Sequence, residues 1–309
     1  FHKIFMQTQT FYSNGKLLLT GEYVVLDGAK ALAVPTRFGQ NLIVTSGNNQ
    51  EIKWTSFDAD KSVWFQDTIT FQEVKNKTLN ENNNKVKNTL IEILHQAFKQ
   101  NPNFLNEDGY SIETELTFPR VWGLGTSSTL INNIGQWLEI DAFELLQKSF
   151  GGSGYDIACA QNCSPIIYQL ENNIPNITPV HFDPEFKENI HFVYLNKKQS
   201  SKSAISNYLA HQSKAEKVIS KITSITYDAI ACEEGKDFAL LMERHEIIMS
   251  DVLEAQTVKE IHFEDFSGVV KSLGAWGGDF AMVISRNNPK DYFASKGFDT
   301  VLSYDEMIL

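Results

Sequence analysis

The stretch 119-PRVWGLGTSSTLINN-133 places a proline, two glycines and four hydroxyl residues directly before an amphipathic run. The apolar positions of that run have helical spacing: Leu130, Ile131, Ile134, Trp137 and Leu138. The first turn of a helix presents unpaired backbone N–H groups and the positive end of the helix dipole. Glycines let a bulky anion approach those groups, so the stretch fits either a phosphate cradle or an ordinary turn with a Ser/Thr cap.

The composition indicates a globular chain of two domains. Its 309 residues are 42% hydrophobic and 21% charged, and single hydrophobic cores usually stop growing at about 250–300 residues. The 27 Lys and Arg residues against 38 Asp and Glu residues give a formal charge of −11. This charge disfavours generic binding to nucleic acids or anionic membranes, because that attraction needs a positive surface. An anionic ligand would need locally gathered cations.

The sequence also predicts a reducing, cytoplasmic setting. The three cysteines, Cys159, Cys163 and Cys232, give no disulfide framework, and no Cys or His nearby completes a zinc-binding set. No stretch reaches the roughly 18 apolar residues of a membrane-spanning helix, and the first residues show no secretory signal. We therefore expect a small-molecule ligand rather than a nucleic acid or a membrane.

The order of the patterns along the chain indicates alternating strands and helices. Short apolar runs predict strands through residue 75, a polar loop follows at 76–88, and helical spacing begins at Thr89. SIETELTFP predicts a further strand, which ends at Pro119. Prolines and weak periodicity near 172–188 indicate a domain junction. The other predicted elements are helices at 127–138, 142–149, 204–231, 236–253 and near 264–272, and strands at 165–170, 190–195 and 280–285.

Three further segments carry candidate chemistry. In 15-GKLLLTGEYVVLDG-28, Lys16 opens an apolar strand and Glu22 follows a turn, although the segment alone could be a simple hairpin. The segment 273-LGAWGGDFAMVIS-285 is a glycine-rich turn that leads into a strand. In 151-GGSGYDIACA-160, Asp156 stands among small and apolar residues and could also cap a helix. Neither GxxxxGK[ST] nor GxGxxG, the two standard nucleotide signatures, fits the chain.

Taken in order, these segments resemble the GHMP kinase superfamily, which comprises galactokinases, homoserine kinases, mevalonate kinases, phosphomevalonate kinases and their relatives. The first family motif is matched by GKLLLTGEYVVLDGAKALAVP. The second, PxxxGLGSSA, is matched by PRVWGLGTSS, and the third, GAGGGGxxxxL, by GAWGGDFAMVI. The matches stand in the family's order and span nearly the whole chain.

The resemblance implies a two-domain α+β fold: an N-terminal ATP-binding domain at 1–186 with a left-handed, ribosomal-protein-like βαβ unit, and a ferredoxin-like C-terminal domain at 187–309. It implies ATP and Mg²⁺ as cofactors, and transfer of the γ-phosphoryl group to a substrate oxygen. By position, Asp156 is the implied catalytic aspartate, Lys16 the lysine that pairs with it, and Ser127 the Mg²⁺ ligand. The implied ATP-binding residues are Gly123, Leu124, Gly125, Thr126, Ser127, Ser128, Gly274, Gly277 and Gly278. The implied substrate-binding residues are Glu22, Tyr23, Ser201 and Lys202.

Within the superfamily, three details resemble phosphomevalonate kinases more than mevalonate kinases: GEY followed by VV, the GYDIA sequence at 154–158, and GGD in the third motif. The resemblance places a substrate-side loop at 197–210. The basic residues that could gather positive charge for an anionic substrate are Arg120, Lys197, Lys198 and Lys202.

The chain departs from the family patterns at Thr126, Ser128 and Trp276, and the Trp276 indole could narrow the site or stack on the nucleotide. No Glu stands at the spacing of the second Mg²⁺ ligand of mevalonate kinases. We expect phosphomevalonate or mevalonate as substrate. The alternatives are a sugar or homoserine kinase, a non-catalytic homologue that binds a ligand, and an interaction scaffold with accidental glycine turns. A homodimer is compatible with the resemblance, and the sequence does not fix the oligomeric state.

Overall fold

The computed structural model describes residues 8–79, 84–199, 201–210 and 216–309, without the side chains of 201 and 202. The chain forms two compact units that interleave in sequence. The first comprises 1–15, 38–120 and 125–161, and the second 16–37, 121–124 and 162–309. These interleaved units differ from two consecutive domains separated at one position. The predicted domain boundary between residues 186 and 187 stays a prediction.

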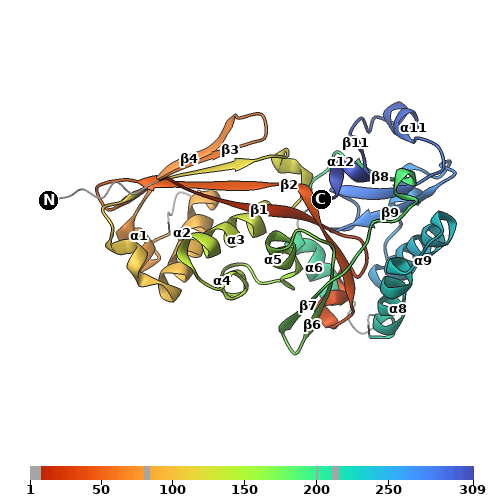
Figure 1. Cartoon of the computed structure of the whole chain (residues 1–309), viewed down its shortest axis with the longest axis horizontal. Helices are drawn as coiled ribbons and strands as arrows, with labels where there is room; N and C mark the ends of the chain where they lie inside the picture. The colour runs from red at the N-terminus through yellow and green to blue at the C-terminus, as the bar shows by residue number, and fades with distance from the viewer. Residues whose placement is uncertain (1–7, 80–83, 200, 211–215) are drawn as a thin grey trace. The chain divides into compact units, whose positions relative to one another are not determined.

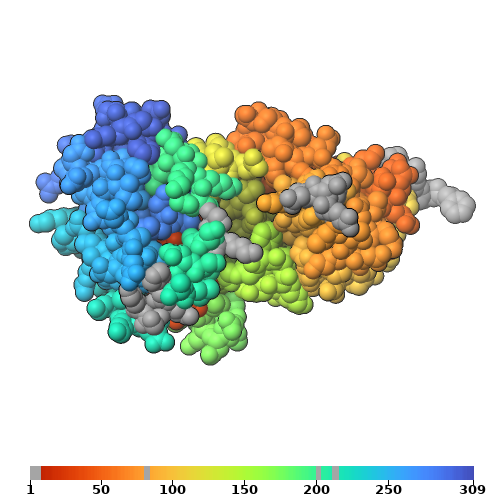
Figure 2. Space-filling view, turned by 180° about the vertical axis from the view of Figure 1, so that it is seen from behind, coloured from red at the N-terminus to blue at the C-terminus, as the bar shows by residue number. Residues whose placement is uncertain are grey.

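The first unit is a sheet with helices packed on one face (Figure 1). Its strands follow the order β4-β3-β5-β2, β1 pairs with β2, and β3 runs parallel to β5. β1 and β2 also contribute residues to the second unit. The orange atoms of Figure 2 belong to β3, β4, α1 and α2. The elements are β1 (Gln9–Leu18), β2 (Ala31–Ser46), β3 (Glu51–Phe57), β4 (Val63–Thr70), β5 (Tyr110–Leu116), α1 (Phe71–Asn76), α2 (Lys85–Gln100), η2 (Pro102–Asn106), α3 (Thr126–Leu138), α4 (Ala142–Ser149) and α5 (Tyr155–Gln161).

The core of the first unit follows from the two sequence periods. Along β3 and the second half of β2, at residues 40–45, every second side chain is buried, including Leu42, Val44 and Ile52, as expected for a sheet with one covered face. Ile131 and Ile134 of α3 come from the same apolar stripe and are completely buried. The sheet and the helices therefore enclose one apolar layer, which holds α3 by its inner face.

The second unit contains an antiparallel sheet in the order β11-β8-β10-β9. In addition, β6 pairs with the start of β2 at Ala31–Ala33 and with β7. The strands are β6 (Ile166–Glu171), β7 (Ile174–Pro179), β8 (Ile190–Tyr194), β9 (Val269–Leu273), β10 (Phe280–Ile284) and β11 (Val301–Ser303). The helices are η1 (Val24–Asp27), η3 (Arg120–Trp122), η4 (Lys187–Asn189), α6 (Ser201–Ala210), α8 (Ile219–Ile230), α9 (Gly235–Leu253), α10 (Val258–His262), α11 (Lys290–Ser295) and α12 (Tyr304–Met307).

The α+β prediction is confirmed, and several element predictions are wrong. The predicted strands through residue 75 include η1 (Val24–Asp27) and α1 (Phe71–Asn76), and the predicted loop at 76–88 contains the first turn of α2, which begins at Lys85. The predicted helix near 264–272 is instead a turn followed by β9, which pairs with β10 along its whole length. The segment contains Lys271 and Ser272, which are polar but buried in β9, so its polar positions do not mark an exposed face, and the period alone does not distinguish a strand from a helix. The predicted helix over 204–231 is interrupted by a turn at 216–218, and 211–215 lie outside the described residues. Within the described part of the chain, no helix has the length and apolar character needed to cross a membrane.

Candidate functional site

The start of α3, in the first unit, has no side-chain cap. Its N-cap residue is Gly125, with φ of 101°, and no side-chain hydrogen bond closes the first turn. The Ser128 hydroxyl donates instead to the Gly125 carbonyl at 2.9 Å, and the Thr129 hydroxyl donates to Gln40 Oε1 at 2.8 Å. The alternative of an ordinary Ser/Thr cap therefore does not apply. The helix start keeps its positive potential for an external anion.

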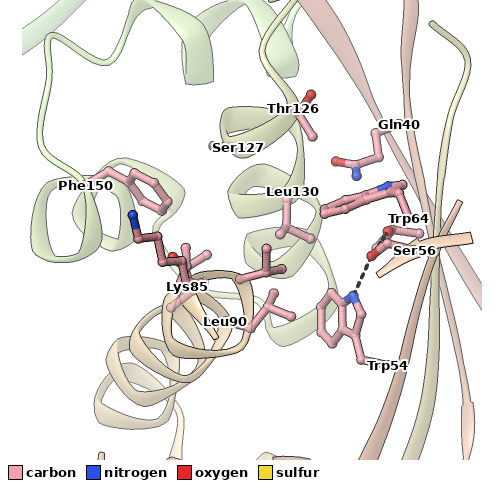
Figure 3. A pocket seen from close by; sticks show the side chains of 14 residues that line it. Gln40, Trp54, Ser56, Trp64, Lys85, Leu90, Thr126, Ser127, Leu130 and Phe150 are labelled. Carbon is pink, nitrogen blue, oxygen red and sulfur yellow. Dashed lines mark hydrogen bonds between the residues drawn. The ribbon is translucent and has the colours of Figure 1, made fainter. Parts of the chain in front are cut away.

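A cavity of about 220 Å³ lies beside this helix start and is lined only by residues of the first unit. Figure 3 shows Trp54 and Trp64 opposite Lys85 and Phe150, with Leu130 of α3 between them. The other lining residues are Gln40, Ser56, Val86, Thr89, Leu90, Ile93, Thr114, Thr126 and Ser127. Mostly apolar and aromatic walls with a few polar groups are typical of small-molecule pockets. The size suits one planar ring rather than a whole nucleotide.

Among the residues that the structure describes, two polar atoms at this cavity are buried without a hydrogen-bond partner, namely Trp64 Nε1 and Thr126 Oγ1. Their neighbours are satisfied, since Trp54 Nε1 donates to Ser56 Oγ at 3.0 Å and Thr114 Oγ1 donates to the same oxygen at 2.8 Å. Unpartnered buried polar groups are rare in folded proteins and call for an explanation. A bound ligand that carries acceptor atoms would supply one.

Asp156 lies in the first turn of α5, in the same unit as the start of α3. The two helices pack together, and Gln161 Nε2 donates to Asn132 Oδ1 at 3.0 Å between them. The carboxyl is partly buried. The structure thus brings the predicted aspartate onto a helix that packs against α3, the helix that begins in the GLGTSS stretch. Its predicted pairing with Lys16, which belongs to the second unit, stays a prediction.

Lys16 is held to the first glycine of the GLGTSS stretch, within the second unit. Its Nζ donates to the Gly123 carbonyl at 3.2 Å, and its backbone N–H donates to the Leu124 carbonyl at 3.0 Å. Asp279 packs on the same glycine, because a Cβ at Gly123 would stand 2.3 Å from Asp279 Cγ. Burial raises the pKa of Asp279, while the Gln199 N–H, which donates to it, and the charges of Lys16 and Lys198 oppose this shift.

The third motif forms a loop at 274–278 that the segment after β8 crosses closely. Gly278 has no room for a side chain, since a Cβ there would stand 2.1 Å from Gln199 Cγ and 2.8 Å from the Lys197 carbonyl oxygen. The Asp279 N–H donates to the Lys197 carbonyl at 2.7 Å, and the Gln199 amide donates to Asp279 Oδ1 at 3.2 Å. The Trp276 indole is fixed by donation to the Gln256 carbonyl at 2.9 Å. Lys197 and Lys198 themselves are exposed.

Glu22 is buried, at 4% exposure, in a charged cluster of the second unit. Lys271 Nζ lies 2.6 Å from Glu22 Oε1, and His245 Nε2 lies 3.4 Å from Glu22 Oε2. Burial raises the pKa of Glu22, and the charge of Lys271 opposes this. Burial and Lys271 also hold the pKa of His245 well below its usual value, so the imidazole is neutral. This placement favours a supporting role for Glu22 over direct contact with a substrate.

The structure therefore groups the predicted residues by unit. Gly125, Thr126, Ser127, Ser128 and Asp156 belong to the first unit, and Lys16, Glu22, Tyr23, Gly123, Leu124, Gly274, Gly277 and Gly278 to the second. Ser201 and Lys202 open α6, and their side chains lie outside the described residues. Sequence reasoning missed the residues that wall or brace the site: Trp54, Trp64, His245, Glu246, Lys271 and Asp279. Of these residues, only Asp279 stands in a motif that could have pointed to it, since it is the aspartate of the GGD sequence in the third motif.

Neither a protein-family model nor a curated protein matches the chain. Solved structures do. The Methanococcus jannaschii mevalonate kinase aligns with a TM-score of 0.70 and 17% identity, over 96% of each chain. The Streptococcus pneumoniae phosphomevalonate kinase, in complex with phosphomevalonate and AMPPNP, gives 0.68 and 15%, over 96% of this chain and 99% of that one. The Lactococcus lactis galactokinase in complex with galactose gives 0.64 and 12%, over 94% and 88%.

These alignments show that the chain has the GHMP kinase fold over nearly its whole length. The resemblance seen in the three motifs is thereby confirmed at the level of the fold. Kinases for mevalonate, phosphomevalonate and galactose are among the similar structures, so the fold does not select one substrate.

Proposed function

We propose that this chain is an ATP-dependent small-molecule kinase that phosphorylates phosphomevalonate or mevalonate. The observation that carries the proposal is the helix start of α3, which opens on glycine without a side-chain cap and adjoins the tryptophan-lined cavity. An anionic tail and a flat aromatic ring are the two parts of a nucleotide. The GHMP kinase fold and the order of the three motifs support the same reading.

In this proposal, the phosphates of ATP lie on the first amides of α3 and the base enters the cavity beside it. The helix dipole and the backbone N–H groups favour negative charge at that position. The partly exposed Trp64 side chain offers a stacking surface, and the buried Trp64 Nε1 and Thr126 Oγ1 could bond to acceptor atoms of the nucleotide. The Arg120 guanidinium, 4.7 Å from the centre of the Trp64 ring, steadies this wall.

Asp156 would orient or deprotonate the acceptor hydroxyl, and Lys16 would keep Asp156 ionised. Ser127, whose hydroxyl is exposed at the helix start, is a suitable oxygen ligand for Mg²⁺ together with the ATP phosphates, since Mg²⁺ is commonly held by few protein ligands plus phosphate oxygens. When bound, the ion would neutralise charge that develops on the transferring phosphoryl group.

The acceptor assignment has two supports. GEY, GYDIA and GGD resemble phosphomevalonate kinases, and the exposed Lys197 and Lys198 offer positive charge beside the third motif, whose Asp279 is bonded to that segment. A sugar or homoserine kinase is the alternative within the fold. We further propose a cytoplasmic location, because the three cysteines give no disulfide framework. A homodimer stays an expectation.

The test is ADP release by the purified protein, with mevalonate, phosphomevalonate, homoserine and galactose offered separately. Asp156→Asn is expected to lower kcat at least about 100-fold, the usual size of a general-base contribution, with little change in ATP binding. Asp291→Asn, at an exposed site on α11, should retain full activity. Turnover of galactose alone would refute the acceptor assignment, and undiminished turnover in Asp156→Asn would refute the mechanism.

A further inference from the structure

Tyr23 occupies a strained turn of the backbone. Its φ of 63° and ψ of −54°, with the Val24 N–H donating to the Glu22 carbonyl at 2.7 Å, define a γ-turn of the rare kind with positive φ. A bulky residue at positive φ persists only where the surroundings hold it, and such residues gather at functional sites. Contacts with neighbouring residues must therefore stabilise this conformation of Tyr23.

The buried cluster described above fixes this turn on its amino side. The Gly21 N–H donates to His245 Nε2 at 2.9 Å, and the Glu22 carboxylate accepts from Lys271 Nζ at 2.6 Å. Lys271 is 1% exposed and His245 is 1% exposed. A buried ion pair is commonly no more stabilising than apolar residues of the same size. Its presence here is better explained by the geometry that it imposes on residues 21–23.

The turn presents the Tyr23 hydroxyl to the loop of the third motif. The Trp276 backbone N–H donates to Tyr23 Oη at 2.6 Å, and the Tyr23 ring stacks on Tyr208 of α6 with centroids 5.5 Å apart. The Tyr208 hydroxyl in turn bonds to the Asp27 carboxylate. A chain of contacts thus runs from the Glu22–Lys271 pair through Tyr23 to the 274–278 loop, and all its members belong to the second unit.

We propose that Glu22, Lys271 and Tyr23 are positioning residues for the 274–278 loop, with Tyr23 as the group that fixes the Trp276 amide. This inference rests on the proposed function, in which that loop orients the phosphates of bound ATP for transfer. It gives Glu22 a role different from the substrate contact that the motif resemblance implies. The loop keeps its conformation because the Tyr23 hydroxyl, and not only the glycines, determines where its backbone lies.

Tyr23→Phe tests the proposal because it deletes the hydroxyl and keeps the ring and the turn. We expect amide hydrogen exchange at Trp276 to accelerate at least tenfold and kcat to fall at least tenfold, while the KM values for ATP and acceptor change less than threefold. Tyr304→Phe is the matched control, since Tyr304 is also buried and its hydroxyl donates to the Phe182 carbonyl at 2.9 Å. It should lose similar stability and change neither exchange at Trp276 nor kcat.

The pair Glu22→Gln and Glu22→Gln with Lys271→Met separates positioning from folding. The double variant also removes the Lys271 charge, which has lost its ion-pair partner in Glu22→Gln. At pH 5, where Glu246 with its pKa of about 7 is mostly protonated, its thermal midpoint should therefore recover relative to Glu22→Gln alone, whereas kcat should stay at least tenfold low. Full recovery of kcat in the double variant would overturn the positioning role, provided that the wild type is an active kinase. Unchanged amide hydrogen exchange at Trp276 in Tyr23→Phe would overturn it as well. A wild-type protein that releases no ADP with any acceptor would instead refute the proposed function, and the exchange measurement would still decide the positioning of the loop.

Discussion

Glu246 is a buried carboxyl whose charge state makes stability depend on pH. Burial raises its pKa from 4.5 to about 7, Lys271 and the Ser272 hydrogen bonds oppose this, and the charge of Glu22 adds to it. Because the folded-state pKa is the higher one, this group's contribution to stability is complete below about pH 4.5 and is lost as pH rises through 7. The loss amounts to roughly 3 kcal/mol by linkage.

The substitution Glu246→Gln can retain both hydrogen bonds to Ser272 and should remove this decrease of stability with rising pH. Urea unfolding at pH 5 and pH 8 measures the change in the free energy of unfolding between the two pH values. The substitution Glu264→Gln, at an exposed carboxylate, is the control. Equal pH dependence in wild type and Glu246→Gln would contradict the prediction.

At the scale of the element, the loop that enters α3 depends on a glycine in contact with a neighbouring carboxylate. Gly123 has φ of 72°, and a Cβ would stand 2.3 Å from Asp279 Cγ. Gly297 has φ of 87° with nothing within 4 Å of its Cβ position, so it is the matched control.

Both Gly→Ala variants should lose about 1–2 kcal/mol of the free energy of unfolding, because an alanine is strained in the left-handed backbone conformation. Gly123→Ala should lose at least about 1 kcal/mol more, because overpacking at a contact of this kind adds typically 1–3 kcal/mol. Denaturant unfolding compares the two, and equal losses would show that Asp279 yields without cost.

Elements with a long, one-sided apolar stripe could be predicted from the sequence, and short buried ones could not. The predicted helix at 127–138 differs from the observed α3 (Thr126–Leu138) by one residue, because its stripe faces a single layer. β9 is buried along its length except for the partly buried Val269, and its buried residues include the polar Lys271 and Ser272. The positions of polar residues in this segment therefore do not show which face is exposed, and the sequence spacing predicts a helix instead of a strand. The absence of a side-chain cap on α3 was also beyond the sequence, since Ser128 could equally have capped the helix or bonded to the Gly125 carbonyl.

At the scale of the whole molecule, the order of three motifs was enough to predict the fold, whereas the walls of the site were not predictable. Trp54, Trp64, Lys85 and Phe150 line one cavity although they come from β3, β4, α2 and the residue after α4. Pairings over such separations depend on the tertiary fold and leave no local pattern. The same holds for the cluster of Glu22 with Lys271, whose partners are 249 residues apart.

The cavity and the α3 start together predict how ATP should stabilise the folded chain. A ligand at one hundred times its Kd adds about 2.7 kcal/mol to the free energy of unfolding, which should raise the thermal midpoint by roughly 5 °C. Trp64→Leu removes one stacking face, worth about 1–3 kcal/mol for a base, so the same ATP concentration should give between about one tenth and two thirds of that shift. Inorganic tripolyphosphate lacks the base and, in the proposed site, would contact only the helix start, so its smaller shift should be the same in both proteins. Thermal unfolding followed by fluorescence measures all four combinations. If ATP raises the thermal midpoint of wild type and Trp64→Leu equally, the base gains no stabilisation from Trp64. That result would place the base outside this cavity.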